Sequence, residues 1–311
     1  MTLLQLTAQS GELELIDLDD SLQTALHLAA DGGYNGVLET LINAHATVIC
    51  GSADSTTIQQ MMQPGQLCVL LPASSTQLLA AHADLQTKNN RSETPLYNAC
   101  EGGHTEVVKL FVRQQQVPIN VAGIASTFAI DLHLIQIQEQ RQRTPLYIAC
   151  WGEHRGIVSA LLEAKADINA ATDRGQTALH AACYGPIDIM NMLIHSGRGN
   201  LEARDNDGYT PLHRACARNE IELVQALLDA GTNVNVRTTN GDLQFLGYVA
   251  ERTALHVAAY WGYTEIAKIL LKASIDAGIL DARGKTALQV AEDEKENEMI
   301  ELLLSQSSLT A

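Results

Sequence analysis

The chain has 311 residues, of which 46% are hydrophobic and only 4% aromatic, and its formal net charge is −16. A chain of this length buries a substantial core. The acidic charge excludes nucleic acid and anionic membrane surfaces as partners, because these need clustered Lys and Arg, and it favours a basic protein partner, although solubility alone is the simpler explanation.

The first twenty residues have no basic segment and reach acidic residues early, unlike a secretory signal or a mitochondrial presequence. No apolar run is long enough to cross a bilayer. We therefore expect a cytoplasmic, intracellular protein without membrane insertion. Residues 1–20 read as half of a helical repeat, with Gly11 between two helices, and we expect them to cap one end of a repeat array.

A tetrapeptide of the TALH or TPLY type recurs along the chain, and its first residue is called here the anchor threonine. The anchors at 144, 177 and 210 are 33 residues apart, as are those at 253 and 286. The intervals from 210 to 253 and from 94 to 144 are longer by 10 and 17 residues. The anchors are Thr24, Thr94, Thr144, Thr177, Thr210, Thr253 and Thr286. Such a period indicates a repeat array.

Each anchor is followed by the same predicted elements: a short apolar helix, a turn containing Gly, and a second helix. The apolar residues of the second helix, such as Ile221, Val224 and Leu227, fall at helical spacing on one face. One repeat is too small to bury that face, so neighbouring repeats must stack. Gly197 and Gly231 are placed to end second helices in the left-handed conformation.

The segment after the first repeat is a weaker copy of the pattern. A step of 33 residues from Thr24 reaches Thr57, and the segment that follows ends in AHADL, much as the preceding unit ends in AHATV. We therefore predict a degenerate repeat that begins near residue 54.

The period, the TPLH-like anchors and the GADVN-like endings at 166–169 and 232–235 resemble the ankyrin repeat family. The resemblance covers nearly the whole chain and implies a single all-α domain over 1–311, an ankyrin-repeat solenoid of helix–turn–helix units with projecting β-turn or hairpin fingers. The repeats are expected to start near residues 21, 54, 91, 141, 174, 207, 250 and 283. The last one turns acidic where no further repeat would pack, and we expect it to form the other cap.

Two fingers are predicted to be enlarged, within about 114–143 and 237–252, because the extra residues fall where the turn projects. In the first, apolar and polar residues alternate from Phe128 to Ile137, which favours a strand paired with 117–121. In the second, Asn240-Gly241 favours a hairpin turn. The residues expected to be exposed there and to contact a partner are Phe128, Phe245 and Tyr248. Alternatively, both insertions are loops that only pack on their neighbours.

Repetition explains most histidines and cysteines. The fourth tetrapeptide position holds His27, His180, His213 and His256. Tyr97, Tyr147 and Gln289 replace them elsewhere, so the hydrogen bond to backbone that the resemblance implies fits better than a shared metal site.

Six residues after the anchor stand Cys100, Cys150, Cys183 and Cys216. Neighbouring repeats would hold these sulfurs about 8–10 Å apart, beyond disulfide reach, so free buried thiols in a reducing compartment are expected. Cys50 and Cys68 have no explanation.

The resemblance implies that a partner protein lies in a concave groove formed by the turn tips and the first helices. The exposed first-helix positions fall seven and eight residues after each anchor. The partner-binding residues expected there are Glu101, Trp151, Tyr184, Arg218, Tyr260 and Trp261. Both tryptophans of the chain belong to this set, and large aromatics and Arg dominate binding energies at interfaces. The alternative is that each Trp packs against the turn of the next repeat.

The sequence contains no nucleophile elbow, P-loop, HExxH motif or dinucleotide fingerprint. We therefore predict a non-catalytic, monomeric scaffold or adaptor, with no catalytic residue, no cofactor and no metal site. Three alternatives stay open: a regulatory ankyrin domain of a larger signalling protein, a microbial ankyrin effector that sequesters host proteins, and an enzyme with an unfamiliar site in 50–93.

Overall fold

The computed structural model describes residues 25–36, 38, 39, 85, 86, 88, 89, 91–113, 117, 119–124, 142–239 and 251–307. The chain forms two compact units, Met1–Asp167 and Ile168–Ala311, called here unit 1 and unit 2. Within the described ranges the secondary structure is helical apart from one two-stranded antiparallel sheet. The described helices are too short and too polar for any of them to span a membrane.

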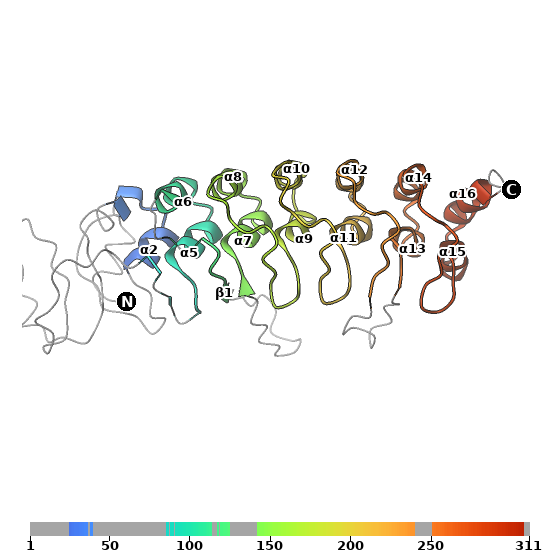
Figure 1. Ribbon diagram of the computed structural model, residues 1–311, viewed down its shortest axis with the longest axis horizontal. Helices are drawn as coiled ribbons and strands as arrows, with labels where there is room; N and C mark the ends of the chain where they lie inside the picture. Colours follow the sequence, from blue (N-terminus) through green and yellow to red (C-terminus); the bar gives the residue numbers. More distant parts are fainter. Residues whose placement is uncertain are drawn as a thin grey trace, which may run out of the picture. The chain divides into compact units, whose positions relative to one another are not determined.

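Unit 1 is built from two rows of short helices (Figure 1). The first-helix row packs α2 against α5 and α5 against α7, and the second-helix row packs α6 against α8. The bounds are α2 Ala25–Asp31, α5 Pro95–Glu101, α6 Thr105–Val112, α7 Pro145–Trp151 and α8 Arg155–Glu163. Each first helix begins one residue after its anchor threonine.

Unit 2 repeats the same two-row arrangement (Figure 1). Its first helices are α9 Ala178–Ala182, α11 Pro211–Ala217, α13 Ala254–Tyr260 and α15 Ala287–Glu294. Its second helices are α10 Ile187–His195, α12 Ile221–Asp229, α14 Thr264–Lys272 and α16 Asn297–Ser307. Every second helix from α10 to α14 turns one apolar side to the core. In α12 that side consists of Leu223, Val224 and Leu227, so the prediction for Ile221 is wrong, because its side chain is 36% exposed.

The anchor residues start the first helices and the fourth-position histidines join neighbouring repeats. In unit 2, His180 Nδ1 accepts a hydrogen bond from the Thr177 N–H, and its Nε2 lies 3.0 Å from the Tyr209 carbonyl of the next repeat. His213 and His256 repeat this bridge, and His27 makes it in unit 1 with the Glu93 carbonyl. Burial lowers the pKa of all four rings, which keeps them neutral. The predicted structural role is confirmed.

The four cysteines of the repeats are buried and free, as predicted. Burial raises the pKa of each thiol, that of Cys183 to about 12, so none is a thiolate at neutral pH. The Cys183 Sγ–H is 3.3 Å from the carbonyls of both Leu179 and Pro211. Cys50 and Cys68 lie outside the described residues.

Glycines end two second helices as expected. Gly197 follows α10 with φ +65° and Gly231 follows α12 with φ +86°, a backbone conformation that residues with a Cβ adopt only at a cost.

The first insertion is closed by the sheet, in a register that differs from the prediction. Strand β1 (Gly123–Ile124) pairs antiparallel with β2 (Gln142–Arg143). No described residue of 117–121 is in a strand, and residues 119–120 form a turn, so the predicted pairing of that segment is wrong. The segment Phe128–Ile137 lies outside the described residues.

The second insertion is also closed by antiparallel backbone pairing. The Thr238 N–H donates to the Arg252 carbonyl at 2.8 Å, and the Glu251 N–H donates to the Thr238 carbonyl at 3.0 Å. Asn240, Gly241, Phe245 and Tyr248 lie outside the described residues, as do residues 1–20 and 50–84.

Candidate partner-binding surfaces

The predicted contact residues lie at the C-terminal ends of the first helices. In unit 1, Glu101 is the last residue of α5 and Trp151 the last of α7. In unit 2, Arg218 is the C-cap residue of α11. Tyr260 is the last residue of α13 and Trp261 is its C-cap residue. Tyr184 lies two residues after the end of α9. Repeat geometry places these positions on the same face within each unit. Of the remaining predicted residues, Phe128, Phe245 and Tyr248 are not described.

In unit 1 an exposed tryptophan is supported by an arginine. Trp151 is 41% exposed. The guanidinium of Arg143 lies 5.5 Å from the centre of the Trp151 ring and 5.7 Å from that of Tyr147. Arg143 is itself buried, so each cation–π contact is partly desolvated and contributes about 1 kcal/mol. The indole is thereby fixed in orientation with a large part of its surface open.

In unit 2 two successive first helices share an aromatic–cation contact. The guanidinium of Arg218 lies 4.3 Å from the centre of the Tyr184 ring. Arg218 also lies 4.0 Å from the Glu220 carboxylate, at the limit of an ion pair. Because the Tyr184 ring is half-buried and Arg218 exposed, the guanidinium lies outward over the ring and is available to a partner.

The end of α13 carries an aromatic platform, defined by Tyr260, Trp261 and Tyr263. The Tyr260 and Trp261 rings meet edge-to-face with centroids 5.1 Å apart, and the Trp261 and Tyr263 rings are stacked at 6.4 Å. Trp261 is 51% exposed. The Arg252 guanidinium lies 4.9 Å from the Tyr260 ring centre and 3.7 Å from the buried Asp281 carboxylate. These contacts hold the rings in place before any partner binds.

The supporting residues Arg143 and Arg252 are absent from the predicted set. Both stand one position before an anchor threonine, and each contacts the residue seven positions after it, Trp151 or Tyr260. Lys285 and Asp293 are related in the same way and form an ion pair. Alignment of the repeats on their anchors reveals the shared position, which holds Gln23, Glu93, Gln176 and Tyr209 in the other repeats.

Arg214 in unit 2 has a structural role. Its guanidinium bonds to the carboxylates of Asp205 and Asp207, each at 2.7 Å, and lies 4.8 Å from the Tyr209 ring centre. Asp205 in turn accepts from the Tyr209 N–H. The network fixes the projecting turn before α11 and leaves no charge of this group unpaired.

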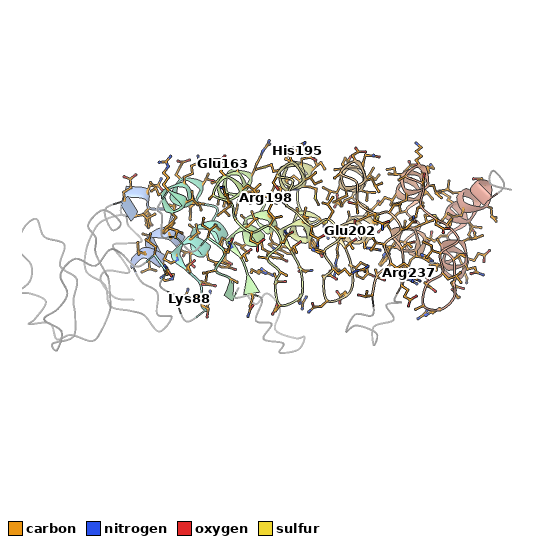
Figure 2. The ribbon with its side chains drawn as sticks, viewed as in Figure 1. Lys88, Glu163, His195, Arg198, Glu202 and Arg237 are labelled. Atoms are coloured by element: carbon orange, nitrogen blue, oxygen red, sulfur yellow. The ribbon has the colours of Figure 1, made fainter. Side chains whose placement is uncertain are left out.

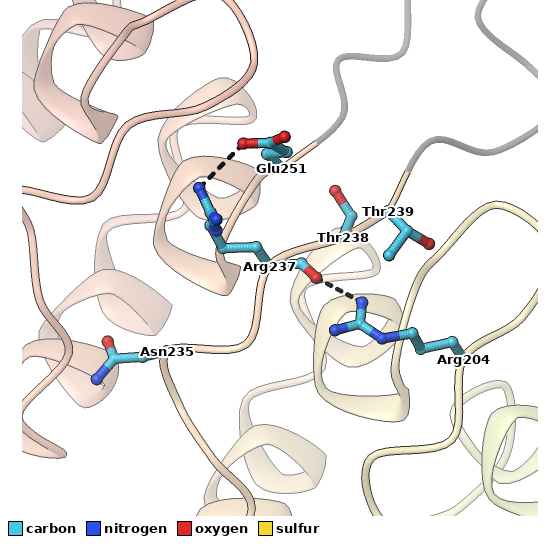
Figure 3. Close-up of a pocket in the computed structure, with 6 residues that line it drawn as sticks. All are labelled: Arg204, Asn235, Arg237, Thr238, Thr239 and Glu251. Atoms are coloured by element: carbon cyan, nitrogen blue, oxygen red, sulfur yellow. Dashed lines mark hydrogen bonds and ion pairs between the residues drawn. The ribbon is translucent and has the colours of Figure 1, made fainter.

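An open depression of about 550 Å³ lies at the base of the second insertion (Figure 3). Arg237 pairs with Glu251 at 3.0 Å across it, Arg204 donates to the Arg237 carbonyl, and Asn235 accepts from the Asp276 N–H. The charges of Arg237 and Glu251 are therefore paired with each other, and the Arg204 guanidinium donates to the backbone carbonyls of Gly208 and Arg237. Over the described part of the chain, no three His, Cys, Asp or Glu side chains are grouped to hold a metal ion, so the expectation about metals and cofactors stays a prediction.

Comparison with known proteins identifies the repeats. The model of the family "Ankyrin repeats (3 copies)" matches residues 72–172, 124–205, 169–238 and 240–311, and that of the single ankyrin repeat matches 21–51. The chain belongs to the ankyrin repeat family. The predicted resemblance and the all-α repeat fold are thus confirmed. Ankyrin repeats form a general protein–protein interaction fold that is typically non-catalytic.

Two similar proteins place the ankyrin assignment in context. Alpha-latrotoxin-Lg1a of Latrodectus geometricus is 33% identical over 92 residues, which are 29% of this chain and only 6% of that toxin. The ankyrin repeat domain of Bcl-3, a member of the IkappaB protein family, has a similar structure with a TM-score of 0.62 and 23% sequence identity. The match covers 93% of this chain and 99% of that domain. The second likeness concerns the fold alone.

Proposed function

We propose that this ankyrin chain is a non-catalytic, monomeric scaffold or adaptor that binds a partner protein at the first-helix ends of its repeats. The observation that carries the proposal is the exposure of Trp151 in unit 1 and of Trp261 in unit 2, each held by a neighbouring ring or guanidinium. Glu101, Tyr184, Arg218 and Tyr260 complete the proposed contact residues.

Physical arguments support these side chains as the main contacts with a partner protein. Trp, Tyr and Arg supply most of the energy of protein interfaces, since they bury large areas with few rotatable bonds. A ring that is already fixed loses less conformational entropy on binding than a mobile one. The net charge of −16 favours a basic partner by long-range attraction and disfavours nucleic acid.

The proposed location is intracellular. Four buried free thiols, one in each of four consecutive repeats, persist most readily in a reducing compartment. The enlarged fingers with Phe128, Phe245 and Tyr248 are proposed as secondary contacts. A second candidate function, a domain of a longer protein, is favoured by the latrotoxin match, in which the similar segment is 6% of the relative; the intact mass of the native protein distinguishes the two.

A pull-down with identification by mass spectrometry tests the proposal. We compare the wild type with a Trp151→Ala, Tyr184→Ala, Trp261→Ala variant, which should lose its specific partner. The matched control, Ile221→Ala, Leu280→Ala, Leu304→Ala, removes apolar side chains that are 36%, 48% and 50% exposed outside the proposed contact residues and should keep the partner. Equal recovery of partners by all three proteins would contradict the proposal.

A further inference from the structure

Three tyrosine rings of unit 2 share one arrangement, in which an arginine lies over the ring and a carboxylate lies beside the arginine. The guanidinium carbon is between 4.3 and 4.9 Å from the ring centre, and a guanidinium nitrogen is no more than 4.0 Å from the carboxylate. Both neighbours stabilise the positive charge. The three sets are Tyr184 with Arg218 and Glu220, Tyr209 with Arg214 and Asp205, and Tyr260 with Arg252 and Asp281.

The other two rings of the aromatic platform, Trp261 and Tyr263, have no such arginine. They stack on each other with centroids 6.4 Å apart, and Trp261 is 51% exposed. Within the described part of the chain, no Lys or Arg side chain lies over either ring. The exposed surface of the indole is therefore open to a cation from another molecule.

A carboxylate of the kind found in the three sets is present beside these two rings. Gly262 lies between Trp261 and Tyr263 in the chain, and Glu296, the residue before α16, packs against it. A Cβ on Gly262 would lie 2.7 Å from the carboxyl carbon of Glu296, so this close approach requires a glycine. The Glu296 carboxylate is thus held against the backbone that joins the two rings.

The charge of Glu296 is not balanced by the residues around it. The side chain is half-buried, and no Lys or Arg in the described ranges forms an ion pair with it, its exposed neighbour Lys295 included. Packing alone does not require an acid here, because in unit 1 the imidazole of His104 fills the equivalent place beside Gly33. The segment 292–298 holds five acidic residues and one lysine, which adds to the attraction for a cation.

We propose that Trp261, Tyr263 and Glu296 form a site for an arginine side chain of the partner protein, with its guanidinium on the exposed indole and beside the Glu296 carboxylate. The inference rests on the proposed function and adds the chemistry of one partner residue. With this arginine the site has the same three components as the sets that unit 2 completes from its own residues.

Arginine fits this site better than the other groups that stack on aromatic rings. Its planar guanidinium stacks on a ring and donates two parallel N–H bonds to a carboxylate, whereas the lysine ammonium is a point charge without a flat face. A nucleic-acid base also stacks on Trp and Tyr, but its phosphates would be repelled by the acidic segment 292–298.

The test uses random peptides displayed on phage, which are depleted on a Trp261→Ala variant and then selected on the full-length wild type. The selected peptides are resynthesised, and their affinities are measured by calorimetry for the wild type and for Glu296→Gln. Two controls remove the same charge elsewhere. Glu298→Gln does so in the first turn of α16, and Glu163→Gln does so at the end of α8 in unit 1 (Figure 2). Thermal unfolding verifies that every variant is folded.

The expected result is one fixed arginine in the selected peptides, with affinity at least about tenfold weaker for Glu296→Gln and changed less than about twofold for either control. Replacing that arginine by citrulline, which keeps the shape and removes the charge, should weaken binding to the wild type by about tenfold or more. The same replacement should cost less in Glu296→Gln, because the charge pair is already lost.

Three other outcomes would count against the site. Peptides that depend on Trp261 but carry no fixed arginine, or a fixed lysine instead, would overturn this inference and leave the proposed function intact. Equal losses in Glu296→Gln and Glu298→Gln would overturn it as well, because the general acidic field would then explain the binding. A selection that enriches no peptide on the wild type, even without depletion, would count against the proposed function too.

Discussion

The α5 repeat of unit 1 and the α13 repeat of unit 2 use the same two positions for opposite chemistry. In the α13 repeat, Arg252 supports the ring of Tyr260, and its charge is balanced by Asp281. In the α5 repeat the same two positions hold Glu93 and Glu101, whose carboxyl pKa values are raised by burial and lowered by the charge of Arg91. The comparison teaches that one backbone framework carries either an aromatic ring with its supporting arginine or two acidic side chains, depending on two residues.

Removal of Arg252 should have the largest effect on stability. The side chain of Asp281 is fully buried and that of Arg252 only 11% exposed, so Arg252→Gln leaves a buried carboxylate without its counter-charge. We expect the free energy of unfolding to fall by about 3 kcal/mol, as measured by urea denaturation. The control is Arg237→Gln, which breaks an exposed ion pair with Glu251. Similar losses in both variants would show that burial does not distinguish them.

Glu93→Gln should increase the stability of the protein, whereas Arg252→Gln decreases it. The pKa of Glu93 is raised by burial to about 7, so the folded state binds its proton more tightly than the unfolded state. The associated stability is present below about pH 4.5 and is lost as pH rises to 7. At pH 8 the Gln variant should therefore be more stable than the wild type by about 2 kcal/mol, and the hydrogen bond that Asn89 donates is kept. A difference that is equal at pH 4.5 and pH 8 would contradict this assignment.

His213 should give unit 2 a pH dependence of the opposite sign. Burial lowers its pKa to about 4, so its contribution is present above about pH 6.5 and is lost as pH falls to 4. His213→Gln should lower stability at pH 7 by about 1 kcal/mol, because the bond to the Arg252 carbonyl is lost. Gln289 shows that Gln preserves the cap. Between pH 4 and 6.5 the urea midpoint of the variant should vary less with pH than that of the wild type. An equal variation in both proteins would exclude His213 as the source of the pH dependence.

The smallest effects are expected from the exposed ion pairs of the second helices. Glu106 pairs with Lys109 in unit 1, and Glu265 pairs with Lys268 in unit 2, with the same spacing and similar exposure. Glu106→Gln and Glu265→Gln should each change the free energy of unfolding by less than about 0.5 kcal/mol. A larger loss in one unit alone would reveal a difference between their second-helix rows that the contacts do not show.

Much of the fold follows from the sequence because its causes are local. The 33-residue period, the anchor threonines and the apolar spacing place the first and second helices. Repetition also assigns His180 and Cys183 to structural roles, since a position occupied in several repeats serves the array. The same counting puts Trp151 and Trp261 at first-helix ends, although their role as contacts stays a prediction.

The tertiary structure alone determined which residues come into contact across a turn. Arg143 and Trp151 are separated by a whole helix, and neither local preference nor periodicity tells that the guanidinium folds back over the ring. The strand register at Gly123–Ile124 likewise depends on how the two ends of the insertion meet. Sequence determined which residues form helices, and three-dimensional packing determined which charges face one another.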